Sequence, residues 1–246
     1  MTRGLYAVIG AAIYLIFFAT FLYLIAFVGN IAVVPRLIDS GPAAPVGVAL
    51  AIDVALIALF GVQHSVMARR GFKAAWTRIV PPVLERSGYV LAASLVLIVL
   101  FAFWRPIPQA LWVVTNPVGV YVLWALFGLG WAIVLLSTFL INHFELFGLK
   151  QVWLNLTGRP EGQMKFRTPF FYRFVRHPLY SGFILAFWAT PVMTVGHLVL
   201  ALGMTVYILI AISYEERDLV ETFGDEYRTY RRATGKLFPG IGRSKA

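Results

Sequence analysis

The chain has 246 residues, of which 60% are hydrophobic and 13% charged. An ordinary soluble domain carries about 25% charged residues, so this composition excludes a soluble globular protein and indicates a chain that lies mostly in lipid. The net charge of +10 does not indicate a nucleic-acid partner, because the basic residues all lie outside the apolar segments and suit anionic lipid headgroups.

Six apolar stretches come near the ~20 residues that a membrane-spanning helix needs. Three of them are short, so we predict an all-α integral membrane protein with about six spans, with five as the alternative. In chain order the stretches are 5–29, 46–66, 89–104, 118–141, 179–191 and 197–213. The last two are predicted to form a tight helical hairpin, because Pro191 and Gly196 interrupt the apolar run.

The basic residues predict the orientation of the chain in the membrane. In a six-span arrangement, all of the 21 Lys and Arg residues except Arg36 and Arg105 lie on one side. This is the positive-inside pattern, and it predicts a multi-pass protein of the plasma (inner) membrane with both termini in the cytoplasm. We expect one domain over 1–246, with four helices in 1–141 and a cofactor-binding half in 142–246.

The segment that follows the last apolar stretch has a different pattern. Residues 215–234 are predicted to form an amphipathic helix at the cytoplasmic face. One face of this helix would carry five residues at spacings of three or four, namely Glu216, Val220, Phe223, Tyr227 and Tyr230.

Three of the four histidines are predicted to lie at the cytoplasmic boundary. His64 ends the second apolar stretch, His143 follows the fourth and His177 precedes the fifth. None has the spacing of a ligand pair on one helix, so we predict no metal site. Asp53, inside the second stretch, is interpreted as a buried group that fixes helix packing.

The segment 176–182, RHPLYSG, is the sharpest local motif. Its proline suits the first position of a helix, and the exposed N–H groups of such a helix start favour an anion beside Arg176 and His177. Ser181 and Gly182 are small enough to let a ligand or another helix approach. An ordinary helix start with a basic flank is the alternative interpretation.

Glu215 and Glu216 form the second motif, because two adjacent carboxylates interrupt a basic run. They are suited to accept hydrogen bonds from a ribose or an amine and to attract a cation. The alternative is pairing with Arg217 or Arg228.

Together these motifs resemble the membrane methyltransferases related to isoprenylcysteine carboxyl methyltransferase and phospholipid N-methyltransferase. That group pairs an Arg-His-Pro-x-Tyr-x-Gly element with a later Glu-Glu pair and a Phe-Gly-x-Glu-Tyr-x-x-Tyr stretch, which is FGDEYRTY at 223–230 here. The segments QHSVMAR at 63–69 and HFELFGL at 143–149 resemble the bacterial methanethiol S-methyltransferase branch, which is also similar to NnrU-like membrane proteins.

The resemblance implies an enzyme that uses S-adenosylmethionine to methylate a small thiol, converting methanethiol to dimethyl sulfide at the cytoplasmic membrane face. We expect Arg176 and His177 to hold the carboxylate of the cofactor, and Glu215 and Glu216 to hold its ribose or amine. The other residues that we expect on the cofactor side are Tyr180, Gly182, Tyr227, Tyr230 and Arg231.

A thiol acceptor reacts as its thiolate, and even cysteine has a pKa of about 8.5, so a base would assist the reaction. His64 is the first candidate and His143 the second, with Glu145 close to the latter and Arg69 available to stabilise a thiolate. Two alternatives remain: a methyltransferase for a phospholipid amine or a prenylated carboxylate, and a non-enzymatic NnrU-like transporter or sensor. The sequence gives no oligomeric state.

Overall fold

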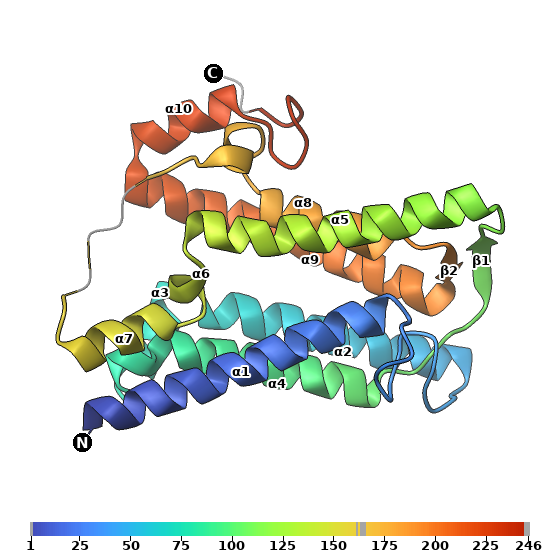
Figure 1. Ribbon diagram of the computed structural model, residues 1–246, viewed down its shortest axis with the longest axis horizontal. Coiled ribbons are helices and arrows are strands. Elements are labelled where there is room, and N and C mark those ends of the chain that lie inside the picture. The colour runs from blue at the N-terminus through green and yellow to red at the C-terminus, as the bar shows by residue number, and fades with distance from the viewer. Residues whose placement is uncertain (1, 161, 163–165, 244–246) are drawn as a thin grey trace. The chain divides into compact units, whose positions relative to one another are not determined.

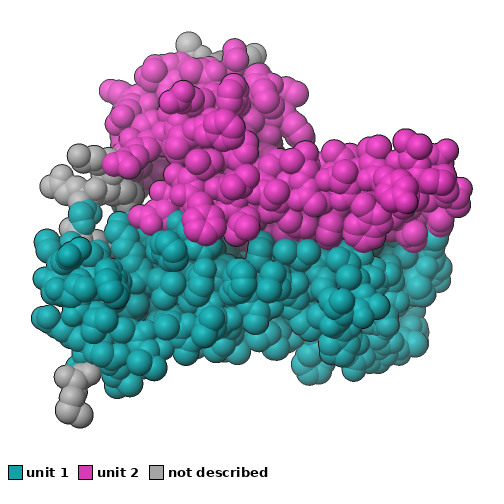
Figure 2. Space-filling view, viewed as in Figure 1, with its two compact units in different colours: residues 1–110, 143–162, 194–200 teal, residues 111–142, 163–193, 201–246 magenta. Residues whose placement is uncertain are grey.

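The computed structural model describes residues 2–160, 162 and 166–243 (Figure 1). Lys165 and Lys245, which contribute to the charge asymmetry, lie outside the described residues. The chain divides into two compact units, shown in teal and magenta in Figure 2. Unit 1 comprises 1–110, 143–162 and 194–200, and unit 2 comprises 111–142, 163–193 and 201–246, so the units interleave along the chain.

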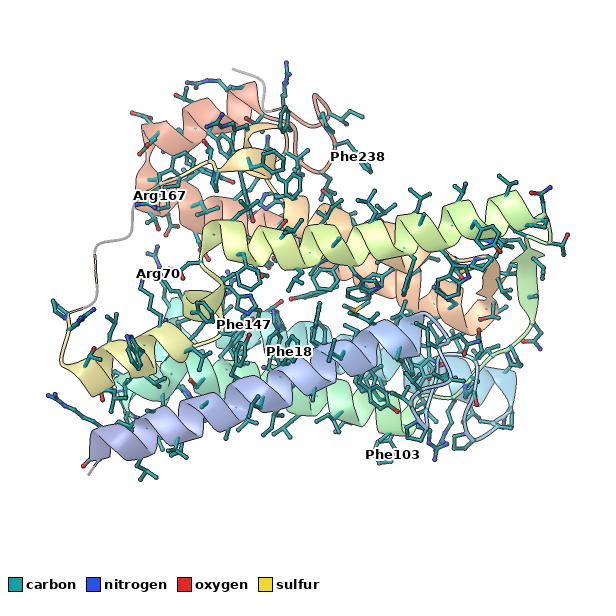
Figure 3. All side chains as sticks on the ribbon, in the orientation of Figure 1. Phe18, Arg70, Phe103, Phe147, Arg167 and Phe238 are labelled. Carbon is teal, nitrogen blue, oxygen red and sulfur yellow. The ribbon has the colours of Figure 1, made fainter. Side chains whose placement is uncertain are left out.

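The described residues are mostly helical, which confirms the prediction of an all-α integral membrane protein. Among the described residues, five helices are long and apolar enough to cross a membrane. They are α1 (Thr2–Val28), α2 (Val46–Met67), α4 (Glu85–Phe103), α5 (Pro117–Ile141) and α9 (Val195–Phe223). Their apolar side chains are often exposed, as at Leu15 (66%) and Phe103 (55%), and Phe103 points away from its helix in Figure 3. Such exposure suits contact with lipid.

Shorter elements lie between the five long helices and after the last of them. The helices are α3 (Arg70–Trp76), α6 (His143–Leu146), α7 (Leu149–Thr157), α8 (Pro178–Trp188) and α10 (Asp225–Ala233), with 3-10 turns η1 (Pro82–Leu84) and η2 (Phe170–Arg173). Strands β1 (Ala110–Val113) and β2 (Val192–Thr194) form a two-stranded sheet. The fifth predicted span is thus α8, which has only 11 residues. Pro191 prevents α8 from continuing, because Thr190, the residue that precedes this proline, is disfavoured in helical geometry.

In unit 1, α4 packs against α1 and α2, and α7 packs against α1. A close approach joins the last pair, because a Cβ added at Gly10 would lie 2.8 Å from the side chain of Val152. At the end of α4, Asp53 accepts a hydrogen bond of 2.9 Å from the backbone N–H of Arg105. Asp53 therefore fixes where two helices meet, in agreement with its interpretation as a packing residue.

In unit 2, α5 packs against α8 through two glycines. A Cβ added at Gly130 would lie 2.7 Å from the backbone nitrogen of Ala186, and one added at Gly182 would lie 2.7 Å from the carbonyl oxygen of Gly130. Small residues at such a contact let two membrane helices approach closely.

We expect Gly130→Ala to lower the thermal stability of the protein in detergent, because its methyl group must push α8 away from α5. Overpacking of this kind costs about 1–3 kcal/mol. Gly128→Ala is the matched control: it lies on the same helix, shares any gain in helix propensity, and its Cβ would meet nothing within 4 Å. Equal melting temperatures for the two variants would contradict this account of the contact.

The predicted amphipathic helix over 215–234 is wrong in its boundaries. Helix α9 continues without interruption to Phe223, because nothing between Ser213 and Phe223 breaks a helix. Gly224 then adopts φ 56°, which favours glycine, and a separate helix α10 follows. Glu216 therefore belongs to the long helix α9, whereas Tyr227 and Tyr230 belong to α10.

Candidate functional site

Arg176 and His177 immediately precede α8, and their backbone is held by a distant segment of the chain. The N–H of Arg176 donates to the carbonyl of Gly235 (2.8 Å), and that of His177 donates to the carbonyl of Lys236 (3.2 Å). Val175 and Gly235 form a parallel bridge. We name residues 234–242 the C-terminal strap, since they run alongside 175–177 and fix the entry into α8.

The side chain of Arg176 is 1% exposed and makes four hydrogen bonds. Its Nε donates to Oε1 of Glu216 at 2.8 Å. Nη1 donates to the carbonyls of Arg231 (3.0 Å) and Thr234, and Nη2 to that of Gly242 (3.1 Å). This guanidinium therefore joins α8, α9, α10 and the strap, and its donors are largely committed within the protein.

Glu216 is the centre of a buried charge cluster. Its Oε1 also lies 3.2 Å from Nε2 of His177, and its Oε2 lies 3.3 Å from Nε of Arg231. The Glu216 side chain is 6% exposed. A buried carboxylate is tolerated only when it is well paired, and three basic side chains pair this one. The structure thus brings together Arg176, His177, Glu216 and Arg231.

Glu215 differs from its neighbour. Successive residues on a helix point about 100° apart, so burial of Glu216 turns Glu215 outward. Its side chain is 44% exposed, and its Oε2 lies 3.9 Å from Nδ1 of His177. Of the two adjacent carboxylates, Glu215 is the one that has room for a ligand.

The three tyrosines of the predicted site differ in their contacts. The hydroxyl of Tyr230 donates to the carbonyl of Tyr172, which supports the backbone before α8. Tyr227 is 2% exposed, and its hydroxyl is buried without a hydrogen-bond partner among the described residues. Burial raises the pKa of both Tyr227 and Tyr230, so their hydroxyls stay protonated at neutral pH. The Tyr180 ring lies 5.7 Å from the His177 ring.

Gly182 lies against α5, where its missing side chain permits the contact with Gly130. Of the two explanations for a small residue in this motif, the approach of another helix fits its position. Gly182 therefore takes part in the packing of α8 against α5.

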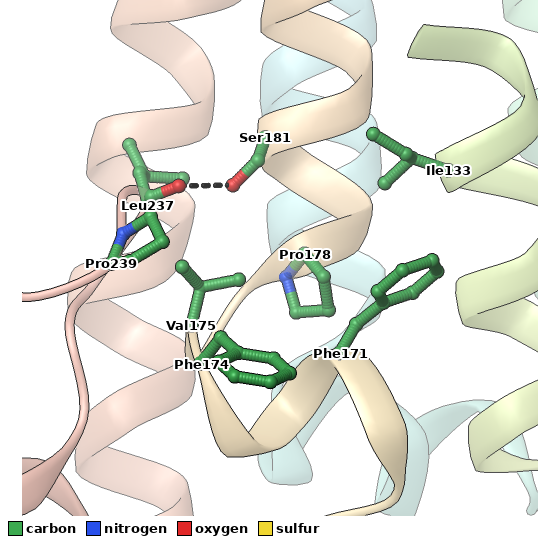
Figure 4. Close-up of a pocket in the computed structure, with 8 residues that line it drawn as sticks. All are labelled: Ile133, Phe171, Phe174, Val175, Pro178, Ser181, Leu237 and Pro239. Atoms are coloured by element: carbon green, nitrogen blue, oxygen red, sulfur yellow. Dashed lines mark hydrogen bonds between the residues drawn. The ribbon is translucent and has the colours of Figure 1, made fainter. Parts of the chain in front are cut away.

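An apolar hollow of about 270 Å³ lies beside the start of α8 (Figure 4). The hydroxyl of Ser181 donates to the carbonyl of Leu237 at 2.7 Å and so ties the strap to α8 beside this hollow. The lining residues are Ile133, Phe171, Phe174, Val175, Pro178, Ser181, Leu237 and Pro239. None of the predicted site residues lines the hollow, so the charged cluster around Glu216 remains the candidate cofactor site.

The predicted thiol-side residues all belong to unit 1. The ring of His64 lies 5.1 Å from that of Phe60 and 4.9 Å from that of Tyr89. Arg69 directs its Nε to the carbonyl of Ser65 at 3.2 Å. His64 therefore stands in aromatic surroundings at the end of α2.

His143 opens the short helix α6 and is 4% exposed. Its Nε2 lies 2.7 Å from the hydroxyl of Tyr14, and its ring lies 4.9 Å from that of Phe147 (labelled in Figure 3). Burial lowers the pKa of His143, so the neutral imidazole predominates at neutral pH. Glu145 forms an ion pair of 2.5 Å with Lys150.

Sequence reasoning missed two parts of this arrangement. The strap binds Arg176 through carbonyl oxygens, and its only sequence signal is a cluster of Gly235, Gly240 and Gly242, the last two of which adopt positive φ. Tyr14 was missed because it lies 129 residues from His143 in an apolar segment rich in aromatic residues.

Comparison with known proteins identifies relatives along nearly the whole chain. Residues 118–226 match the phospholipid methyltransferase family. The methanethiol S-methyltransferase of Mycobacterium tuberculosis is 54% identical over 97% of this chain and 98% of its own length. That of Crocosphaera subtropica is 49% identical over 99% of this chain and 95% of its own length. Nurim of Xenopus laevis is 32% identical over 69% of this chain and 62% of its own length. No solved structure matches the chain significantly.

Proposed function

Because the chain belongs to the methanethiol S-methyltransferase family of membrane proteins, we propose that it methylates methanethiol to dimethyl sulfide with S-adenosylmethionine as the donor. We place the reaction at the cytoplasmic face of the plasma membrane. The observation that carries the proposal is the charge cluster around Glu216, with the exposed Glu215 beside it. Arg176, His177 and both glutamates fall within the segment that matches the methyltransferase family.

The residues of this cluster fit the proposed donor. S-adenosylmethionine supplies an electrophilic methyl group on a sulfonium, and it also carries an amine, a carboxylate and ribose hydroxyls. Glu215 is an exposed anion suited to the amine or the ribose. Arg231, whose side chain is 32% exposed, is suited to the carboxylate. The buried hydroxyl of Tyr227 has a free hydrogen-bonding position among the described residues.

We propose a role for Arg176 and Glu216 that differs from the one expected from the sequence. Their polar atoms are committed to each other, to His177 and to the strap. We propose that they hold Glu215, His177 and Arg231 in place, and that they do not contact the donor themselves. A site that is held rigidly keeps its groups in the geometry that an in-line displacement requires.

On the thiol side we propose that His143 accepts the proton of methanethiol. The sulfur then forms a bond to the methyl carbon, while the electrons of the broken carbon–sulfur bond stay on the donor sulfur. His143 is favoured over His64 because the hydroxyl of Tyr14 holds its ring. His64 remains the alternative base and Arg69 a candidate to stabilise the thiolate, whereas Glu145 is engaged by Lys150.

A headspace assay tests the proposal directly. Purified protein receives methanethiol and S-adenosylmethionine whose methyl group is deuterated, and mass spectrometry seeks deuterated dimethyl sulfide. Parallel reactions contain an amine phospholipid and a prenylated carboxylate. Methylation of either of these, with none of the thiol, would replace the proposed substrate. No labelled product from any acceptor would refute the proposed activity.

We expect Glu215→Gln to weaken the binding of S-adenosylmethionine about 10- to 100-fold, because a hydrogen bond to a charged group contributes about 1.5–3 kcal/mol. Isothermal titration in detergent measures this affinity. Glu221→Gln is the matched control, an exposed glutamate further along α9, and we expect it to bind normally. Unchanged affinity in Glu215→Gln would remove this residue from the cofactor site.

A further inference from the structure

Tyr14 lies in the middle of α1, and its hydroxyl is 2.7 Å from Nε2 of His143. We propose that Tyr14 is a positioning residue that orients the imidazole of His143 and supports its protonated form, an inference that rests on the proposed methylation of a thiol. Both residues belong to unit 1. No local motif links them, so only the folded chain reveals the pair.

The residues around His143 hold its imidazole ring in one orientation. The Tyr14 ring meets the imidazole edge-on at 5.8 Å between ring centroids and 79° between ring planes. Phe144 and Phe147 lie 5.4 and 4.9 Å away in similar edge-on geometry, and Phe147 stacks on Phe17 at 3.9 Å. Apolar rings restrict the space around the imidazole, whereas the Tyr14 hydroxyl fixes one of its nitrogens by a directional bond.

The chemical role of this bond follows from the proton that His143 would receive. In a neutral imidazole one ring nitrogen donates and the other accepts, whereas both nitrogens donate in the imidazolium. The Tyr14 oxygen can accept from Nε2 in the charged state. Burial of His143 disfavours that charged state, so an acceptor at 2.7 Å offsets part of the penalty at the moment when the thiol loses its proton.

The test compares two tyrosine-to-phenylalanine variants of the same helix. Tyr14→Phe removes the hydroxyl that contacts His143 and keeps the ring. Tyr23→Phe is the matched control, because the Tyr23 hydroxyl donates to the carbonyl of Arg36 (3.2 Å) and accepts from its N–H (3.1 Å). Each variant loses a hydroxyl from α1, but only the first loses the contact with the imidazole.

We expect Tyr14→Phe to lower kcat for methanethiol about 10- to 100-fold, the loss of one hydrogen bond to a charged group, with an unchanged KM for S-adenosylmethionine. Tyr23→Phe should keep the wild-type kcat. With 2,2,2-trifluoroethanethiol, a small and more acidic thiol that needs less help from a base, the deficit of Tyr14→Phe should shrink.

Three outcomes distinguish a failure of the proposed function from a failure of the role proposed for Tyr14. A wild-type protein that methylates no thiol refutes the proposed function, and this inference with it. An active wild type with equal kcat in both tyrosine variants overturns the role of Tyr14 alone. A deficit of the same size for both thiols also overturns it, because the hydroxyl would then act on something other than proton removal.

Discussion

Replacing Arg176 by lysine should destabilise the protein by about 1–3 kcal/mol for each buried acceptor that loses its donor. The guanidinium delivers separate donors to Glu216, Arg231, Thr234 and Gly242. Lysine has a single ammonium group at the end of a flexible chain and does not reproduce this planar fork. The strap should therefore detach from the start of α8, and the affinity for S-adenosylmethionine should fall with it.

Thermal unfolding in detergent and isothermal titration with S-adenosylmethionine measure the two effects. Arg228→Lys is the matched control, because Arg228 lies on α10 with its side chain 52% exposed and contacts only Asp225 among the ion pairs described. Exposed changes of this kind usually stay within about 0.5 kcal/mol. If Arg176→Lys and Arg228→Lys unfold at the same temperature, Arg176 does not hold the strap as its contacts indicate.

The second large effect is expected at His143. Removal of a general base typically lowers the rate by about 10²–10⁴, so His143→Ala should reduce kcat for methanethiol by that range and leave the affinity for S-adenosylmethionine unchanged. Steady-state kinetics by headspace detection gives the first quantity and isothermal titration the second. The two readouts separate a defect in thiol activation from a defect in cofactor binding.

His64→Ala is the matched comparison, because His64 is the alternative base and belongs to the same unit. A loss confined to His143→Ala supports the assignment, whereas a loss confined to His64→Ala transfers the role to His64. Near-wild-type kcat in both variants would mean that no histidine of this unit takes the thiol proton.

The spans were predictable because their signal is local. A run of about 20 apolar residues has few alternatives to a membrane helix, and α1, α2 and α5 begin and end close to the predicted positions. The predicted boundaries were wrong at helix ends, because a single residue can determine where a helix stops. Pro191 limits α8 to 11 residues, and Gly224, not Ser213, interrupts the last helix.

The charge cluster was predictable for a different reason. A hairpin returns the chain to the level where it started, so a motif before α8 and a motif late in α9 were expected to meet. The sequence did not show which glutamate would be buried, since that depends on the rotation of α9 relative to α8. The strap was also beyond prediction, because backbone carbonyl oxygens are common to every residue and leave no pattern in a sequence.

The dependence of Arg176 on carbonyls between Arg231 and Gly242 has a consequence for biosynthesis. All five long helices lie before these residues in the chain, so the ribosome makes every predicted span before it makes the residues that complete the site. A nonsense mutation in the codons just beyond α10 would therefore keep all five long helices and remove the carbonyls of Thr234 and Gly242 that hold Arg176.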